Sequence, residues 1–316
     1  MIRIGAINID TSHPLAFCEY LHARTRARYV AVYNNGFRGN DEVEAFISRF
    51  GLEKRCNSIE ELAETVDIGF VQSCNWDNHL AQVMPFLSQN KPVFIDKPIA
   101  GNLADCRCLE ELAAKGKVIL GSSSLRYAQE IVAFANKPES ERGKILNVFA
   151  TAGVDEFNYA IHVVELIGGL AGTGATSCRF AGRSEADGKA CETYFVRFKN
   201  GLTATFNTFQ GAWQPFEVVI MTTQSTFQFR IDTTRIYAAI LDRICDFMET
   251  GKNSLAPMPA LTEAVKIMLA GRISRSREGA EIALADIPAN DPGFDGADFE
   301  RQYAEQGRKN KLYLQK

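Results

Sequence analysis

The sequence has little of several features that mark particular classes of protein. Its 316 residues contain eight cysteines but no C-x-x-C pair, no apolar run of about 18 residues, and no block rich in lysine and arginine. We therefore expect no zinc site, disulfide framework, membrane partner or nucleic-acid surface, and the net charge of −3 agrees with this. Because the first residues lead directly into an apolar strand pattern, we also expect no signal peptide. The composition predicts a cytoplasmic protein with reduced, mostly buried thiols.

Strands and helices alternate along the first 122 residues. Apolar runs predict strands over residues 2–9, 29–33, 68–73, 93–95 and 118–121. Helical patterns fall between them, over residues 14–26, 41–50, 77–88 and 103–115, with a short acidic helix opening at Ser58. Ser58 and Glu61 have the spacing of a capping box. This alternation is typical of βαβ units and predicts an α/β fold with a doubly wound parallel sheet.

After residue 123 the pattern changes to strands in succession. Helices are expected over residues 127–135, 156–170, 235–250 and 261–276, and strands over 145–152, 177–181, 193–199, 202–210, 216–222 and 226–231. Short connections such as Asn200-Gly201 predict an α+β domain with an open, mostly antiparallel sheet, arranged as a meander. One face should pack on helices, while the other is free for a homodimer or larger homo-oligomer. The tail from residue 286 is expected either to wrap back over the first domain or to stay loose.

A lysine follows the short buried strand in Val93-Phe94-Ile95-Asp96-Lys97-Pro98. Pro98 cannot donate to a sheet ladder and has a restricted φ, so the strand should end here. Lys97 then leaves the core at the edge where open α/β sheets bind ligands. Partial burial would favour the neutral amine and lower the pKa of Lys97 toward the range useful for proton transfer. Taken alone, the segment is a strand end with a solvated lysine.

Four segments, in order along nearly the whole chain, resemble the Gfo/Idh/MocA oxidoreductases, which are relatives of glucose–fructose oxidoreductase and inositol dehydrogenase. The family has Glu-Lys-Pro where this chain has Asp96-Lys97-Pro98. The other segments are Cys74-Asn75-Trp76-Asp77-Asn78-His79, the run from Asn158 to Glu165, which is similar to Asp-x-Gly-x-His-x-x-Asp, and a last helix and turn within residues 264–282. The resemblance implies a Rossmann-type dinucleotide-binding domain over residues 1–122. It also implies a substrate and oligomerisation domain over 123–285, with a tail over 286–316.

The resemblance further implies an NAD(P)-dependent oxidoreductase that moves a hydride between nicotinamide and a hydroxyl-bearing carbon of a sugar-like or polyol substrate. Lys97 and His162 would be catalytic, with Asn158 in place of the family's aspartate. Asn158 and His162 are four residues apart, so they would share one face of a helix. Lys97 would disfavour a protonated imidazole, leaving His162 able to accept a proton near neutral pH. The structural alternative for His162 is a satisfied histidine on a helix buried between the domains.

The first turn departs from the family pattern. Asn8, Asp10 and His13 stand where the family has the glycines of Gly-x-Gly-x-x-Gly, which let the backbone approach the pyrophosphate. At about 4 Å and an effective dielectric near 20, Asp10 would oppose each phosphate charge by up to about 4 kcal/mol. The run from Asp10 to Pro14 is also an ordinary helix start. Two alternatives therefore stay open, namely a non-redox ligand-binding or regulatory descendant and a lyase or isomerase using Lys97 and His162.

The residues expected to contact NAD or NADP follow the predicted strands. They are Asn8, Asp10, Thr11, Ser12, His13, Asn34, Cys74, Asn75, His79, Asp96 and Lys97. Asn34 stands where the family has its ribose-binding acid, and Arg38 is near enough to meet a 2′-phosphate, so both cofactors stay open.

The substrate is expected to meet Lys97, Asn158, His162 and Arg126, although Arg126 would equally suit a salt bridge at the domain hinge. Trp76 and Trp213 are candidates for a sugar pocket, but large aromatic residues more often belong to the core. No metal is expected, because the spacing of His13, His79, His162 and Asp10 matches no metal motif.

Overall fold

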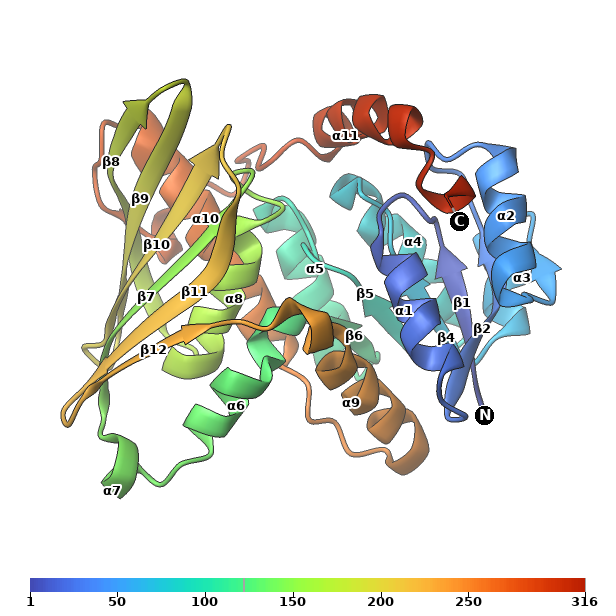
Figure 1. Ribbon diagram of the computed structural model, residues 1–316, viewed down its shortest axis with the longest axis horizontal. Helices are drawn as coiled ribbons and strands as arrows, with labels where there is room; N and C mark the ends of the chain where they lie inside the picture. Colours follow the sequence, from blue (N-terminus) through green and yellow to red (C-terminus); the bar gives the residue numbers. More distant parts are fainter. Residues whose placement is uncertain (122, 316) are drawn as a thin grey trace.

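The computed structural model describes residues 1–121 and 123–315. Its first domain is built on a six-stranded parallel sheet, part of which is labelled in Figure 1. The strand order is β3-β2-β1-β4-β5-β6, so the order reverses between β1 and β4. This confirms the doubly wound, Rossmann-type sheet. The strands are β1 (Ile2–Ile7), β2 (Ala27–Tyr33), β3 (Lys54–Arg55), β4 (Ile68–Val71), β5 (Val93–Ile95) and β6 (Ile119–Gly121).

Five helices connect these strands and cover both faces of the sheet. They are α1 (His13–His22), α2 (Asn40–Phe50), α3 (Ile59–Thr65), α4 (His79–Ser88) and α5 (Leu103–Ala114). All residues of β4 and β5 are buried, as expected for a parallel sheet covered on both sides. Ser58 caps α3 by accepting a hydrogen bond of 3.1 Å from the backbone N–H of Glu61. The Glu61 carboxylate accepts from the N–H of Asn57 instead of Ser58, so the capping box is only half formed.

The second domain contains a seven-stranded sheet in the order β12-β11-β7-β10-β9-β8-β13. Its strands are β7 (Ile145–Gly153), β8 (Ala175–Ala186), β9 (Lys189–Phe198), β10 (Thr203–Gln210), β11 (Gln214–Thr222), β12 (Thr226–Arg230) and β13 (Ile282–Ala283). The mostly antiparallel character is confirmed, but the predicted meander is interrupted because β7 lies between β10 and β11 and runs parallel to β10. Turn residues such as Asn200-Gly201 predict only that strands adjacent in the sequence pair with each other. They do not predict that an earlier strand, β7, lies between two later ones.

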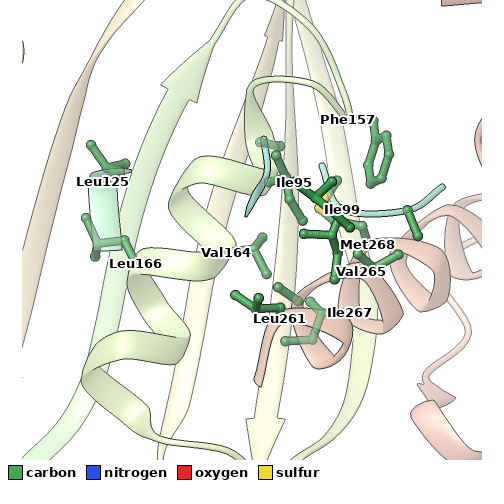
Figure 2. Close-up of a cluster of buried hydrophobic side chains, with 14 of the residues drawn as sticks. Ile95, Ile99, Leu125, Phe157, Val164, Leu166, Leu261, Val265, Ile267 and Met268 are labelled. Atoms are coloured by element: carbon green, nitrogen blue, oxygen red, sulfur yellow. The ribbon is translucent and has the colours of Figure 1, made fainter. Parts of the chain in front are cut away.

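Helices α8 (Ala160–Ala171) and α10 (Met258–Ser276) pack on one face of this sheet (Figure 1). Figure 2 shows Val164 of α8 together with Val265 and Met268 of α10, close to Ile95 and Ile99 of the first domain. All five side chains are buried. This apolar cluster joins the domains, and it therefore places Lys97, which lies between Ile95 and Ile99, at their interface.

Two later helices return to the first domain. Helix α9 (Ile236–Thr250) lies against α1, and the Tyr20 hydroxyl donates to Asp242 over 2.8 Å. In the tail, α11 (Gly296–Asn310) lies on the first domain (Figure 1). Asp295 caps α11 by accepting a hydrogen bond of 2.7 Å from the N–H of Asp298.

The helix predicted over residues 156–170 begins later than expected. Asp155 accepts a hydrogen bond of 2.9 Å from the N–H of Tyr159, which closes a turn before α8 starts at Ala160. Asn158 therefore lies in this turn and not on a helix face with His162. The α-helices not yet described are α6 (Gln129–Ala135) and α7 (Glu139–Arg142). Among the described residues, none of the helices combines the length and apolar character needed to cross a bilayer.

Candidate active site

A cavity of about 240 Å³ lies where the carboxyl ends of β1, β4 and β5 meet the second domain. Lys97 enters it from the first domain, and Asn158 and His162 enter it from the second. The rest of the wall consists of Thr11, Ser12, His13, Gln72, Ser73, Cys74, Asp96, Ser124, Tyr159, Trp213, Phe216, Thr233, Ile236, Tyr237, Phe299 and Tyr303. An amine and an imidazole from different domains thus face one enclosed space that a small molecule could share.

The Lys97 amine is held by the turn before α8. Its Nζ donates to the side-chain Oδ1 of Asn158 over 2.8 Å and to the backbone oxygen of Asn158 over 3.1 Å. Burial lowers the pKa of Lys97, although the carboxylates of Asp96 and Asp155 act in the opposite direction. A lysine with a lowered pKa, fixed by an amide at the cavity wall, is suited to accept or donate a proton there.

The imidazole of His162 is nearly enclosed, with 7% of the residue exposed. Its Nδ1 shares a hydrogen bond of 2.5 Å with the hydroxyl of Ser123, which orients the ring. Burial and then the nearby charge of Lys97 lower the pKa of His162 well below its usual range. The imidazole is therefore neutral near pH 7, as expected from the sequence, and it can hydrogen-bond a substrate hydroxyl without carrying charge.

His13 and Asp96 form a second linked pair at the cavity. His13 Nδ1 lies 2.6 Å from Asp96 Oδ2, and Asp96 Oδ1 accepts from the backbone N–H of Lys97 over 2.8 Å. Burial alone would raise the pKa of Asp96, but His13 and Lys97 outweigh it and lower the pKa. An ionised Asp96 therefore connects the start of α1 with the end of β5. It fixes both His13 and the backbone that carries the Lys97 amine.

In the turn after β1, Asn8 adopts a backbone conformation that is typical of glycine. Asn8 has φ of 63°, in the left-handed region that glycine and, less often, asparagine adopt. Its side chain stabilises this conformation by donating to Ser73 Oγ over 3.0 Å and by accepting from the N–H of Asn35 over 2.8 Å. The first position of the missing motif thus keeps the turn that the family's glycine would make.

Asp10 is fully buried at the second position of the missing motif. Its Oδ2 accepts from the N–H of Cys74 over 3.1 Å, while Oδ1 has no hydrogen-bond partner among the described residues. Burial raises the pKa of Asp10 to about 7, and nearby Glu300 adds to the effect. Near neutral pH the carboxyl group is therefore only partly ionised, and the repulsion of a phosphate expected from a full charge is reduced.

Asn34 and Arg38 are both occupied by structural contacts. Asn34 accepts from the N–H of Ile9 over 3.2 Å and donates to the backbone oxygen of Arg38 over 3.3 Å. The Arg38 side chain is 2% exposed, pairs with Glu42 at 3.0 Å, and donates to the backbone oxygen of Asp10. The suggestion that Arg38 meets a 2′-phosphate is therefore corrected, because its guanidinium already holds the turn after β1.

The segment after β4 divides between the cavity and the core. Cys74 lines the cavity, whereas Asn75 accepts from the N–H of Asp77 over 3.1 Å and begins a short 3₁₀ helix, Trp76–Asn78. His79 lies behind the wall, 1% exposed, with Nε2 3.0 Å from the backbone oxygen of Ser73. Burial lowers the pKa of His79. It therefore supports the loop after β4 and does not line the cavity.

The structure does not bring Arg126 into the cavity. Its buried guanidinium packs against Gly168 and Gly169 of α8, with Nε 3.6 Å from Glu165 Oε2. Arg126 thus forms an ion pair, as in the salt-bridge alternative, but both partners belong to the second domain. Of the two tryptophans, Trp213 lines the cavity and Trp76 is buried in the core.

Several residues in or behind the cavity wall were not expected as site residues from the sequence. Ser123 orients His162, and Asp155 forms the turn that presents Asn158. Asp155 has a local signal, since aspartates often accept hydrogen bonds from backbone N–H groups that follow them. Tyr237 of α9 and Tyr303 of α11 reach the cavity only through long-range packing, for which the sequence contains no local signal.

Residues 4–124 match the Gfo/Idh/MocA family, described as an oxidoreductase family with an NAD-binding Rossmann fold. The first domain is therefore similar to the Gfo/Idh/MocA oxidoreductases. A relative, the uncharacterized oxidoreductase YgjR of Escherichia coli (strain K12), is 24% identical over 205 residues, which are 64% of this chain. The match spans only about half, 53%, of that relative's length.

Solved structures show the same two-domain fold. A probable dehydrogenase from Thermotoga maritima has a TM-score of 0.77 at 17% identity, with 91% of this chain and 100% of that chain covered. The myo-inositol dehydrogenase from Lactobacillus casei, in complex with NAD(H) and myo-inositol, has a TM-score of 0.75 at 16% identity, with 90% and 96% covered. The match over the first domain agrees with the predicted family and with an NAD-binding fold. These relatives give no support to the regulatory or lyase alternatives.

The cavity wall fits the nicotinamide end of such a cofactor. Thr11 and Ser12 line the cavity at the start of α1, where Rossmann domains bind the pyrophosphate. Asn8 keeps the required turn, and the partial neutrality of Asp10 reduces the charge repulsion. Thr11, Ser12, Cys74 and Lys97 are therefore the residues that would hold this end of the dinucleotide.

Proposed function

We propose that the protein is an NAD(P)-dependent dehydrogenase that transfers a hydride between nicotinamide and a hydroxyl-bearing carbon of a polyol or sugar-like substrate. The observation that supports this most strongly is the convergence of Lys97, Asn158 and His162 on one cavity at the end of β5. The NAD-binding family and the fold shared with a myo-inositol dehydrogenase support the cofactor and the substrate class. When bound, NAD(P) supplies the hydride acceptor or donor.

Each side chain has a role that follows from its surroundings. In the oxidation direction Lys97 accepts the hydroxyl proton, because burial favours its neutral form and Asn158 fixes its position. The neutral His162, oriented by Ser123, hydrogen-bonds a neighbouring hydroxyl and places the reacting carbon. Tyr159 completes the wall beside both groups. A polyol suits this wall, because several donors and acceptors converge on a small space.

The test is oxidation of a panel of inositols and sugars, followed by the absorbance of NADH or NADPH. We expect Lys97→Met to lower kcat by about 10²–10⁴-fold, the usual contribution of an acid–base group, with little change in dinucleotide affinity. Lys115→Met is the matched control, because Lys115 is exposed at the end of α5. Full turnover by Lys97→Met, or no turnover of any polyol by the wild-type protein, would contradict the proposal.

We further propose that the chain forms a homo-oligomer through the outer face of the second sheet and works in the cytoplasm. Phe149, Phe195 and Val219 are each only partly buried on this face, opposite α8 and α10. Light scattering should give a mass above 35.0 kDa, and Val219→Glu should reduce it toward that of one chain. The compartment is supported by eight free thiols.

A further inference from the structure

The C-terminal strap, residues 293–314, lies on the edge of the first domain where a dinucleotide is expected. Trp76 Nε1 donates to the backbone oxygen of Phe294 over 2.7 Å, and Asp77 accepts from the N–H of Gly296 over 2.9 Å. Farther along α11, Asn75 donates to Glu300 over 3.1 Å. The first half of the strap is thus fastened to the loop after β4.

The second half of the strap is fastened to the loops after β1 and β2. Arg38 donates to the backbone oxygen of Gly307 over 3.2 Å, and the Tyr313 hydroxyl donates to the backbone oxygen of Thr11 over 2.6 Å. Gly307 packs so closely on Phe37 that an added Cβ would lie 2.8 Å from its ring. The ends of β1, β2 and β4 are all covered, and in doubly wound folds these ends bind the pyrophosphate and the adenosine ribose.

The space left beneath the strap is too small for a whole dinucleotide. The cavity measures about 240 Å³, and Phe299 and Tyr303 of the strap form part of its wall. Pockets that hold drug-sized ligands measure roughly 300–1,000 Å³. The nicotinamide end and a small substrate can be accommodated, but the adenosine end would have to enter the volume that the strap fills.

We propose that the C-terminal strap is an autoinhibitory element that competes with the adenosine half of NAD(P) for the crevice at the ends of β1, β2 and β4. This inference rests on the proposed function, since it assumes that a dinucleotide binds in that crevice. The strap can act as a competitor because Gly307 and Tyr313 hydrogen-bond Arg38 and Thr11 at the edge of this crevice. If the strap covers the crevice in about 90% of molecules, the apparent Kd for the cofactor is raised about tenfold.

The experiment measures binding of NAD+ and NADP+ by calorimetry to the full chain, to a chain ending at Pro292, and to Gly307→Leu. Leucine at position 307 would meet Phe37 and push α11 outward while leaving the chain complete. Gln306→Leu is the control, because residue 306 is exposed on the same helix. We expect the Kd of NAD+ to fall about tenfold for the shortened chain and for Gly307→Leu, and to stay unchanged for Gln306→Leu.

A second readout follows the strap itself. Hydrogen exchange of backbone amides in residues 296–310 should become faster when NAD+ is added, because displacement exposes them. In a Trp213→Phe background, the emission of Trp76, now 3% exposed, should shift to the red. Slower exchange with NAD+, or equal affinities of all four proteins for NAD+, would overturn the proposal that the strap is autoinhibitory. The proposed dehydrogenase activity would still be supported if the full chain oxidised a polyol. Absence of binding to every protein up to about 10 mM would overturn both.

Discussion

Replacing Asp10 by asparagine should make the protein more stable at neutral and alkaline pH. Asp10 is fully buried, and burial raises its pKa from 3.8 to about 7. Between these values the folded protein keeps a proton that the unfolded chain has released, so stability falls as the pH rises. The free energy of unfolding falls by about 1.4 kcal/mol per pH unit in this range. The total loss is roughly 4 kcal/mol once the pH exceeds 7. Asparagine cannot ionise, and its amide oxygen can still accept from the N–H of Cys74.

The assay is urea unfolding at pH 5, 6, 7 and 8, followed by circular dichroism. Wild type should lose roughly 2 kcal/mol between pH 5 and 7 through this group, and Asp10→Asn should not. Titrating groups away from Asp10 contribute equally to both proteins, so the difference between the two curves reports Asp10 together with its coupling to Glu300. Glu111→Gln is the control, because Glu111 is exposed and its variant should follow wild type. Parallel curves for wild type and Asp10→Asn would refute the reasoning, since they would show that Asp10 titrates alike in both states.

Three further predictions concern the same region. Gly36→Ala should lower the free energy of unfolding by about 1–3 kcal/mol in urea titration, because the added Cβ would lie 2.0 Å from Asp10 Oδ1. An unchanged urea midpoint would contradict this prediction. Glu42→Ala should lower the free energy of unfolding by about 3–5 kcal/mol, because it leaves the buried Arg38 charge without its carboxylate partner. A decrease below about 1 kcal/mol would contradict a stabilising role of this ion pair. The rate of polyol oxidation should rise with pH to a plateau set by the neutral form of Lys97, at a pH below the usual lysine pKa, and a rate independent of pH would exclude Lys97 as the base.

The arrangement of the first domain could be predicted from the sequence because its signals are local. Buried runs such as 68–71 and 93–95 alternate with amphipathic segments, and right-handed βαβ connections leave few ways to arrange them. The placement of Lys97 at the domain interface followed from the same logic, since a lysine after a buried strand must leave the sheet at its carboxyl end.

The sequence was less informative where residues distant along the chain meet. The pKa of Asp10 is an example of such a long-range effect. The replacement of a glycine by Asp10 was visible in the sequence, but its pKa depends on enclosure by Gly36, Cys74 and Glu300, which lie 26, 64 and 290 positions away. Arg38 was likewise near enough in sequence for a 2′-phosphate, yet packing turned it toward Glu42 and the backbone of Asp10.

The sequence by itself determined the two kinds of sheet, the family resemblance of the first domain, and the lysine and histidine that face one cavity. These depend on hydrophobic periodicity and short motifs, which are properties of neighbouring residues. Only the tertiary structure decided that β7 is inserted beside β10, that Asn158 precedes its helix, and that the tail covers the crevice. Each of these depends on which buried surfaces and hydrogen bonds are satisfied together once the whole chain has folded, and no local pattern records that competition.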